Sequence, residues 1–438
     1  MPDSVWRVSW GVRTSNLRKS NDLKWPPGVP AHQDVQVLRF DESNEADFRG
    51  ELPEIGGVII GGKFQRREVS MRVRLRALRR QRVFGATAVL LGVSAALLFG
   101  GGTQVKAASP SVEPLRSYAD KMHFWLGAQL QGLFMGNAKY KELIHTQFNS
   151  GVSMELLGQT QPTPQGYDFH IMDHQVEFAR QYDMKLFGVN LVYRPHIGPE
   201  WFETTCKSWS KEKMDSFLKD RVYTLVRRGG DNYYGWEVVN EPLVGGHNGC
   251  WHTVLGEFDY IAKAFRYARE AGPNTQLVLN DSFGHDGVDK EKATQFFGII
   301  KQMKDEKVPI DVAGIQMHLR PDNLHSTYVD EFKWFLAQAK QLGVQVQVTE
   351  MDVKLPPNGG PDILQKQKEM FYNILHTCLK DPNCTGFTFW EPFDSIRRRY
   401  PNDPPQADYD LQRPGIFDAN FQSKPAYDGI LQALKEGR

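Results

Sequence analysis

Short apolar runs alternate with amphipathic stretches from residue 110 to the C-terminus, and this alternation constrains the fold more than any other feature. The runs are rich in β-branched residues, which favours strands, and the stretches between them repeat apolar residues at helical spacing. Eight strands separated by helices over about 330 residues predict an α/β fold, a (β/α)8 or TIM barrel. A doubly wound open sheet is the alternative, but the sequence has no Gly-rich phosphate fingerprint to support it. The predicted strands are 124–130, 151–156, 185–192, 235–240, 276–281, 312–318, 344–350 and 386–390, and the clearest helical stretches are 211–228, 258–271, 330–342 and 363–379.

Polar residues stand at the ends of five of these strands. Active sites of such barrels are built at the C-terminal ends of the strands. One polar strand end commonly serves only as a cap, whereas five that converge on one rim predict a functional site. The residues are Asn240 and Glu241 on strand four, Asn280 and Asp281 on strand five, Gln316 and His318 on strand six, Thr349 and Glu350 on strand seven, and Trp390 and Glu391 on strand eight.

Two of these residues, Glu241 and Glu350, are carboxylates on strands that face each other across the barrel mouth. Glycoside hydrolysis requires such a pair. One carboxyl group is protonated and gives its proton to the leaving oxygen, and the other is ionised and attacks the anomeric carbon. Each is one of 52 acidic residues, most of which are solvated, so the prediction depends on their joint placement. The chemistry requires no metal and no organic cofactor. Asn240 is expected to hold a sugar hydroxyl, and Gln316 and His318 to orient the nucleophile.

Six segments at the strand ends and near the C-terminus carry a family pattern. They are WEVVNEP (236–242), LVLNDS (277–282), VAGIQMHL (312–319), VQVTEMDV (346–353), GFTFWEPFDS (386–395) and GIFDANFQSKPAYDGIL (415–431). These segments resemble the motifs of family 10 glycoside hydrolases, the endo-β-1,4-xylanases, and the resemblance runs from about residue 120 to the C-terminus. It implies that Glu241 is the general acid/base and that Glu350 is the nucleophile of a retaining mechanism, with the carboxyl groups about 5–5.5 Å apart. It also implies that Asn240, Gln316, His318 and Trp390 support the sugar at the cleavage point.

Strands two, three and eight depart from the family pattern. In GVSMELLGQTQP (151–162), Glu155 is the candidate for the family's sugar-binding glutamate, while the lysine and tryptophan of that motif are missing. In VNLVYR (189–194), Val189 and Arg194 replace two histidines and Tyr193 replaces a tryptophan; Glu391 replaces a glycine on strand eight. We expect Glu155, Asn190, Tyr193, Arg194 and Glu391 to contact substrate. Arg194 and Glu391 either form an ion pair or bind a charged or decorated sugar.

The first hundred residues carry an export pattern. Residues 71–82 are strongly basic, residues 83–105 are largely apolar and contain no charged residue, and small residues follow. This order predicts a signal peptide or a single membrane anchor over 71–107, before a catalytic domain over 108–438. Residues 1–70 are then either not translated, with Met71 as the start, or cytoplasmic. We therefore expect a secreted or extracytoplasmic protein, with anchoring in the membrane through 83–105 as the alternative.

All four cysteines follow the apolar segment, and an even number in an exported chain predicts disulfides. The preferred pairing joins Cys378 to Cys384, which are close in sequence, and Cys206 to Cys250. None of the cysteine spacings is typical of a zinc site.

The net charge of +1 gives no basic face for nucleic acid. A polysaccharide or oligosaccharide is therefore the expected partner, and the chain is expected to be a monomer. Two other functions stay open: a carbohydrate-binding protein on an inactive barrel, and a hydrolase or transglycosylase for a different polymer. The sequence leaves open the exact polymer and the choice between internal and terminal cleavage.

Overall fold

Parallel strands form a closed ring in the computed structural model, which describes residues 113–131, 135–193, 198–243, 249–356, 360, 362–394 and 412–438. The ring order is β1-β2-β3-β4-β5-β6-β8-β9, with β9 paired to β1 and β6 paired to β8. The predicted (β/α)8 barrel is thereby confirmed. The strands are β1 (Trp125–Gln129), β2 (Ser150–Met154), β3 (Lys185–Val192), β4 (Tyr233–Asn240), β5 (Gln276–Asp281), β6 (Val312–Ile315), β7 (His318–Leu319), β8 (Gln345–Val353) and β9 (Cys384–Phe389).

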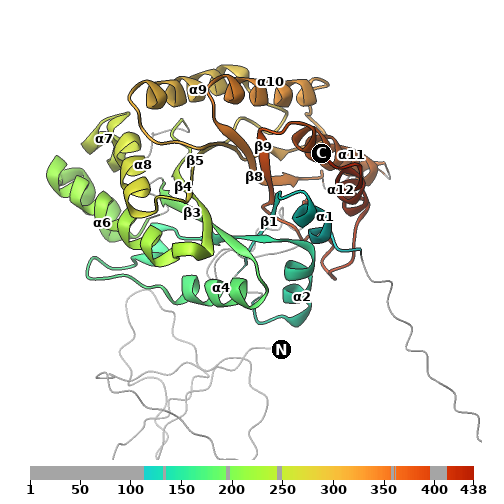
Figure 1. Cartoon of the computed structure of the whole chain (residues 1–438), viewed down its shortest axis with the longest axis horizontal. Coiled ribbons are helices and arrows are strands. Elements are labelled where there is room, and N and C mark those ends of the chain that lie inside the picture. Colours follow the sequence, from blue (N-terminus) through green and yellow to red (C-terminus); the bar gives the residue numbers. More distant parts are fainter. Residues whose placement is uncertain are drawn as a thin grey trace, which may run out of the picture. The chain divides into compact units, whose positions relative to one another are not determined.

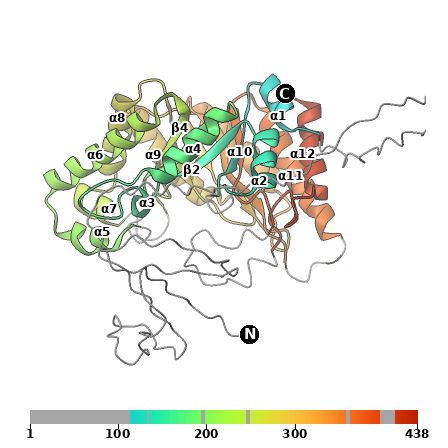
Figure 2. The same cartoon turned by 90° about the horizontal axis from the view of Figure 1, so that it is seen from below.

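Helices follow the strands and surround the ring (Figure 1). The shorter α3, α5 and α7 follow β2, β3 and β4 and gather at one end of the barrel (Figure 2). The helices are α1 (Arg116–Lys121), α2 (Ala138–Gln147), α3 (Leu157–Thr160), α4 (His170–Gln181), α5 (Glu200–Thr205), α6 (Lys211–Gly229), α7 (Cys250–Leu255), α8 (Asp259–Ala271), α9 (Lys290–Asp305), α10 (Tyr328–Gln341), α11 (Ile363–Lys380) and α12 (Pro425–Glu436), with 3-10 turns at Cys206–Ser208 and Gly230–Asn232.

Two buried clusters explain why the strands read as continuous apolar runs. A large cluster packs the strands against the helices. A smaller one, from β2, β3, β5 and β6 together with Trp390, fills the inside of the ring. Strands buried on both faces lack the polar alternation of a half-exposed sheet. The members of the inner cluster are Val152, Phe187, Val189, Val278, Val312 and Trp390.

Both predicted disulfides are confirmed. Cys378–Cys384 joins the end of α11 to the start of β9, with Cα atoms 5.2 Å apart. Cys206–Cys250 joins the segment after α5 to the first residue of α7, with Cα atoms 5.9 Å apart. The second bridge therefore ties the segment that follows β3 to the segment that follows β4, at the end of the barrel where the predicted site lies.

Several predictions fall outside the described residues. These are the N-terminal segments 1–70 and 71–107, with the apolar run 83–105, and the role of Arg194. Among the residues that are described, no helix is long and apolar enough to cross a membrane.

Candidate active site

Glu241 follows the last residue of β4 and lies at the C-terminal rim of the barrel. Its φ is 49°, in the left-handed region that non-glycine residues seldom occupy, and its amide donates to the Asn280 carbonyl at 2.8 Å. Consecutive side chains of an extended strand point to opposite faces. The left-handed turn breaks this alternation, so Asn240 and Glu241 both reach the side chain of Gln316.

Two neutral side chains among the described residues donate to the Glu241 carboxylate. Gln316 Nε2 donates to Oε1 at 2.9 Å, and the Tyr193 hydroxyl donates to Oε2 at 3.0 Å. Gln316 follows β6 and Tyr193 follows β3, so the donors approach from strands on different sides of β4. The side chain sits in a largely buried position, since Glu241 is 8% exposed.

A cationic ring holds the second carboxylate. His318 Nε2 lies 3.2 Å from Glu350 Oε2, and His318 Nδ1 forms an ion pair with Asp352 Oδ2 at 2.9 Å. Burial alone would disfavour the charged ring, but the charges and hydrogen bonds of Asp352 and Glu350 outweigh it and raise the pKa of His318 to about 9. The ring is therefore cationic at neutral pH and places a positive charge beside Glu350.

The side chain of Asn280 joins Glu350 to Asn240, the residue before Glu241. Its Nδ2 donates to Glu350 Oε1 and to Asn240 Oδ1, both at 3.2 Å, and its Oδ1 accepts from Thr349 Oγ1 at 2.7 Å. Thr349 and Glu350 are consecutive, and both reach Asn280 because the register of β8 against β9 shifts between Val348 and Met351. One rim thus carries two carboxylates with different partners, the unequal pair that glycoside hydrolysis uses.

A comparison with protein families agrees with this chemistry. The model of glycosyl hydrolase family 10 matches residues 115–433, well over half of the chain. The chain belongs to glycosyl hydrolase family 10. The resemblance seen in the strand motifs is therefore confirmed, and the protein is a glycoside hydrolase.

Known relatives of this family 10 enzyme include endo-1,4-beta-xylanase B from Thermotoga neapolitana, 30% identical over 333 residues, which cover 74% of this chain and 92% of the relative. The exoglucanase XynX of Acetivibrio thermocellus is 31% identical over 290 residues, 63% of this chain but only 25% of that longer protein. Among solved structures, native xylanase 10B from Thermotoga maritima has a TM-score of 0.65 and 29% identity, covering 74% of this chain and 98% of that one.

The structure brings most of the predicted site residues of the family 10 enzyme together. His318 contacts Glu350 as expected, whereas Gln316, which was expected beside the nucleophile, contacts Glu241 and Asn240 instead. The Trp390 ring is 5% exposed, with its centroid 6.5 Å from that of His318. Glu391 is half-buried directly after Trp390. Since Arg194 is not described, the ion pair between Arg194 and Glu391 stays a prediction, as does the separation of the carboxyl groups of Glu241 and Glu350.

Glu155, in contrast, is not brought to the carboxylate pair. Val152 packs inside the barrel, so the alternation of β2 turns Ser153 toward the helices, where its hydroxyl contacts Gln175 of α4. The Glu155 carboxylate accepts hydrogen bonds from Ser153 and from the Tyr233 hydroxyl on this outer side. Burial raises the pKa of Glu155 to about 7, although these two hydrogen bonds oppose the shift.

Three more residues complete the site: Asn280, which the sequence placed at a strand end without a role, and Asp352 and Glu237, which the sequence did not single out. Asn280 and Asp352 are described above. The third, Glu237 of β4, is 0% exposed, and its Oε1 accepts from Asn190 Nδ2 at 3.2 Å. The signal for Glu237 was a carboxylate in the middle of a strand that is otherwise apolar on both faces. Burial, followed by the charges of Glu350 and Glu241, raises the pKa of Glu237 well above its ordinary value, which favours the protonated acid.

Glu237→Gln is expected to stabilise the protein increasingly as pH rises, because the amide mimics the neutral acid and does not titrate. In the wild type, the folded state keeps a proton that the unfolded state loses above about pH 4.5. The free energy of unfolding of the wild type therefore falls as pH rises from there toward the raised pKa. Denaturant unfolding at pH 4 and pH 7 measures the effect, and the variant's advantage should be greater at pH 7.

The matched control for this experiment is Glu369→Gln, which changes an exposed glutamate on α11. It should show no comparable growth in stability with pH. If the difference between Glu237→Gln and wild type stayed constant from pH 4 to pH 7, the folded protein would hold Glu237 ionised, and the assignment of a neutral carboxyl group would be wrong.

Proposed function

We propose that this family 10 enzyme is a retaining endo-1,4-β-xylanase, with Glu350 as the nucleophile and Glu241 as the general acid/base. One observation carries the proposal. Glu350 lies beside the cationic His318, which favours an ionised nucleophile, and Glu241 lies on the same rim, where it accepts hydrogen bonds from Gln316 and Tyr193. A nucleophile must stay ionised, while an acid/base must gain and lose a proton in each cycle.

In the first step, Glu350 attacks the anomeric carbon as the glycosidic carbon–oxygen bond breaks. The electron pair of that bond leaves with the oxygen, which takes the proton of Glu241. The products are a glycosyl ester on Glu350, an ionised Glu241 and a shortened chain that departs. Asn280 and His318 hold the two oxygens of Glu350, which orients the attack and keeps the carboxylate ready to act as leaving group.

In the second step, water attacks the same carbon and the ester bond returns its electron pair to Glu350. Glu241 accepts the proton that the water loses. Two inversions at one carbon retain the configuration of the sugar. The raised pKa of Glu237, which is hydrogen-bonded to Asn190, favours its neutral acid and so limits the negative charge beside Glu350.

The xylan assignment is supported by similarity to xylanase B of Thermotoga neapolitana and xylanase 10B of Thermotoga maritima. The domain is proposed to span 108–438 and to act outside the cytoplasm, because two disulfides fit an oxidising compartment. The residues in and directly after β3 that differ from the family pattern, Tyr193 among them, are proposed to contact substrate. We therefore expect the enzyme to rank β-1,4-linked polymers as substrates in a different order from its relatives.

The test is sugar release by the purified protein from xylan, mixed-linkage glucan, mannan and cellulose. We expect release from xylan, with oligosaccharides of mixed length early in the reaction because internal bonds are cut. Proton NMR of the first products should show the β-anomer before mutarotation. An α-anomer as the first product would disprove retention. A folded protein that released sugar only from another polymer would disprove the xylan assignment, and one inactive on all four would favour a binding protein.

A further inference from the structure

The hydrogen bonds at Glu241 distinguish its two oxygens. Gln316 Nε2 is a donor only, and it contacts both Glu241 Oε1 and Asn240 Oδ1. Oε1 must therefore accept a hydrogen bond whether Glu241 is ionised or protonated, and this places the transferable proton on Oε2. In the described part of the chain, Oε2 contacts the Tyr193 hydroxyl, which can both donate and accept and so suits both protonation states.

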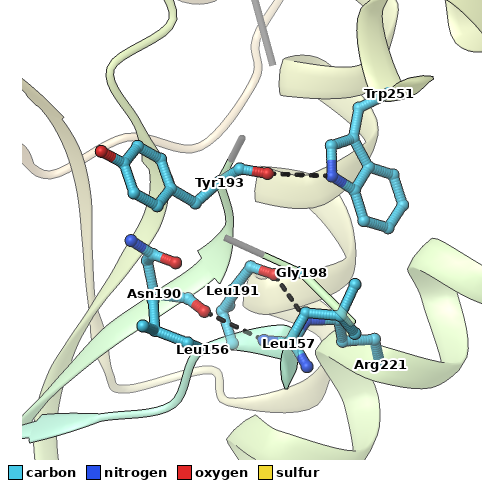
Figure 3. A pocket seen from close by; sticks show the side chains of 8 residues that line it. All are labelled: Leu156, Leu157, Asn190, Leu191, Tyr193, Gly198, Arg221 and Trp251. Atoms are coloured by element: carbon cyan, nitrogen blue, oxygen red, sulfur yellow. Dashed lines mark hydrogen bonds between the residues drawn. The ribbon is translucent and has the colours of Figure 1, made fainter. Parts of the chain in front are cut away.

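The backbone that carries Tyr193 is held from outside the barrel. The indole Nε1 of Trp251 donates to the Tyr193 carbonyl at 3.2 Å, and Arg221 donates to the carbonyls of Leu191 at 2.7 Å and Asn190 at 3.2 Å (Figure 3). Trp251 and Arg221 are each 1% exposed, so water has little access to compete for these hydrogen bonds.

The Cys206–Cys250 bridge fixes Trp251 in turn. Cys250 is the residue before Trp251, and the indole packs on the rings of Phe202 and Phe217, with centroids 5.0 Å and 5.8 Å away. A cavity lined by Trp251, Arg221 and Tyr193 measures about 10 Å³, no more than one water molecule requires. A shift of Tyr193 away from Glu241 would therefore have to displace packed side chains.

We propose that Tyr193 is a positioning residue for the acid/base: its hydroxyl holds the proton-carrying oxygen of Glu241 toward the leaving group, and Trp251 with the Cys206–Cys250 bridge fixes it there. The proposal rests on the acid/base role proposed above for Glu241. It differs from a purely structural role because it concerns proton transfer to the leaving oxygen. Cleavage of a substrate whose leaving group needs no proton should therefore proceed at the same rate without the Tyr193 hydroxyl.

The test compares kcat/KM of the full-length protein on two substrates, a xylo-oligosaccharide and a dinitrophenyl β-xylobioside, whose leaving group departs without a proton. Tyr193→Phe keeps the ring and removes the hydroxyl. We expect it to lower kcat/KM on the oligosaccharide by about 10- to 100-fold, the range for loss of one hydrogen bond to a charged group, and to leave the aryl substrate almost unchanged. Trp251→Phe, which keeps an aromatic ring but loses the bond to Tyr193, should show a smaller loss of the same selectivity.

Tyr223→Phe is the matched control, because the hydroxyl of Tyr223 on α6 contacts Glu270 on α8, away from the site. It should change neither value. An equal loss on both substrates in Tyr193→Phe, or no loss on either, would overturn the positioning role. A wild-type protein that cleaved neither substrate would instead overturn the proposed function, and this inference with it.

Discussion

Glu350→Gln is expected to lower xylan hydrolysis at least about a thousandfold, because an amide cannot form the glycosyl ester. The fold should survive the change, since the amide occupies the same volume. The amide offers one acceptor oxygen where the carboxylate offers two, so either Asn280 or His318 loses its acceptor. Reducing-sugar release from xylan, measured beside thermal unfolding, checks both expectations.

The control for this variant is Glu369→Gln, the same chemical change at an exposed position on α11. It should retain wild-type activity. If Glu350→Gln kept more than about a tenth of the activity while folded, Glu350 would not be the nucleophile, because loss of a nucleophile lowers rates by orders of magnitude.

Glu241→Ala is expected to lower hydrolysis of xylo-oligosaccharides by about 100- to 10,000-fold, the usual contribution of a general acid/base. The first step on a dinitrophenyl β-xylobioside should still proceed, because that leaving group needs no proton. The second step should then be slow, because no base activates the water. The glycosyl ester on Glu350 should therefore accumulate.

Two measurements check this prediction. Rapid mixing should show a burst of dinitrophenol close to one equivalent, and mass spectrometry of the intact protein should show one added glycosyl unit. Peptide mapping should place that unit on Glu350. A variant that lost activity equally on both substrates, without a burst, would show that Glu241 is not the acid/base. It would also remove the basis for a positioning role of Tyr193.

Most of the barrel could be predicted from sequence because burial on both faces produces a local pattern. The structure has β3 at Lys185–Val192 and β5 at Gln276–Asp281, which match the predicted bounds. The predicted strand 312–318 differs: β6 ends at Ile315 and β7 begins at His318. The break follows from Met317, whose φ of 63° interrupts the extended chain.

The orientation of individual side chains could be predicted less well from the sequence. Glu155 matched a motif position, yet the alternation of β2 turns it toward α4. Glu237 lies within a motif, but the rise of its pKa follows from burial and from the charge of Glu350, which comes from a distant segment, with a further contribution from the charge of Glu241. A motif specifies neither the face of a strand nor the field in which a carboxyl group titrates.

The sequence by itself determined the barrel and the two strand ends that carry Glu241 and Glu350, because each depends on local burial. It also indicated the pairing of the cysteines, because Cys378 and Cys384 are close in sequence and leave Cys206 and Cys250 as the other pair. Only the tertiary structure decided which groups hold these carboxylates. Tyr193 and Glu241 are 48 residues apart, and Asn280 and Glu350 are 70 apart. Such contacts depend on ring closure, on the register shift in β8 and on the left-handed turn at Glu241, and these properties arise when the strands meet.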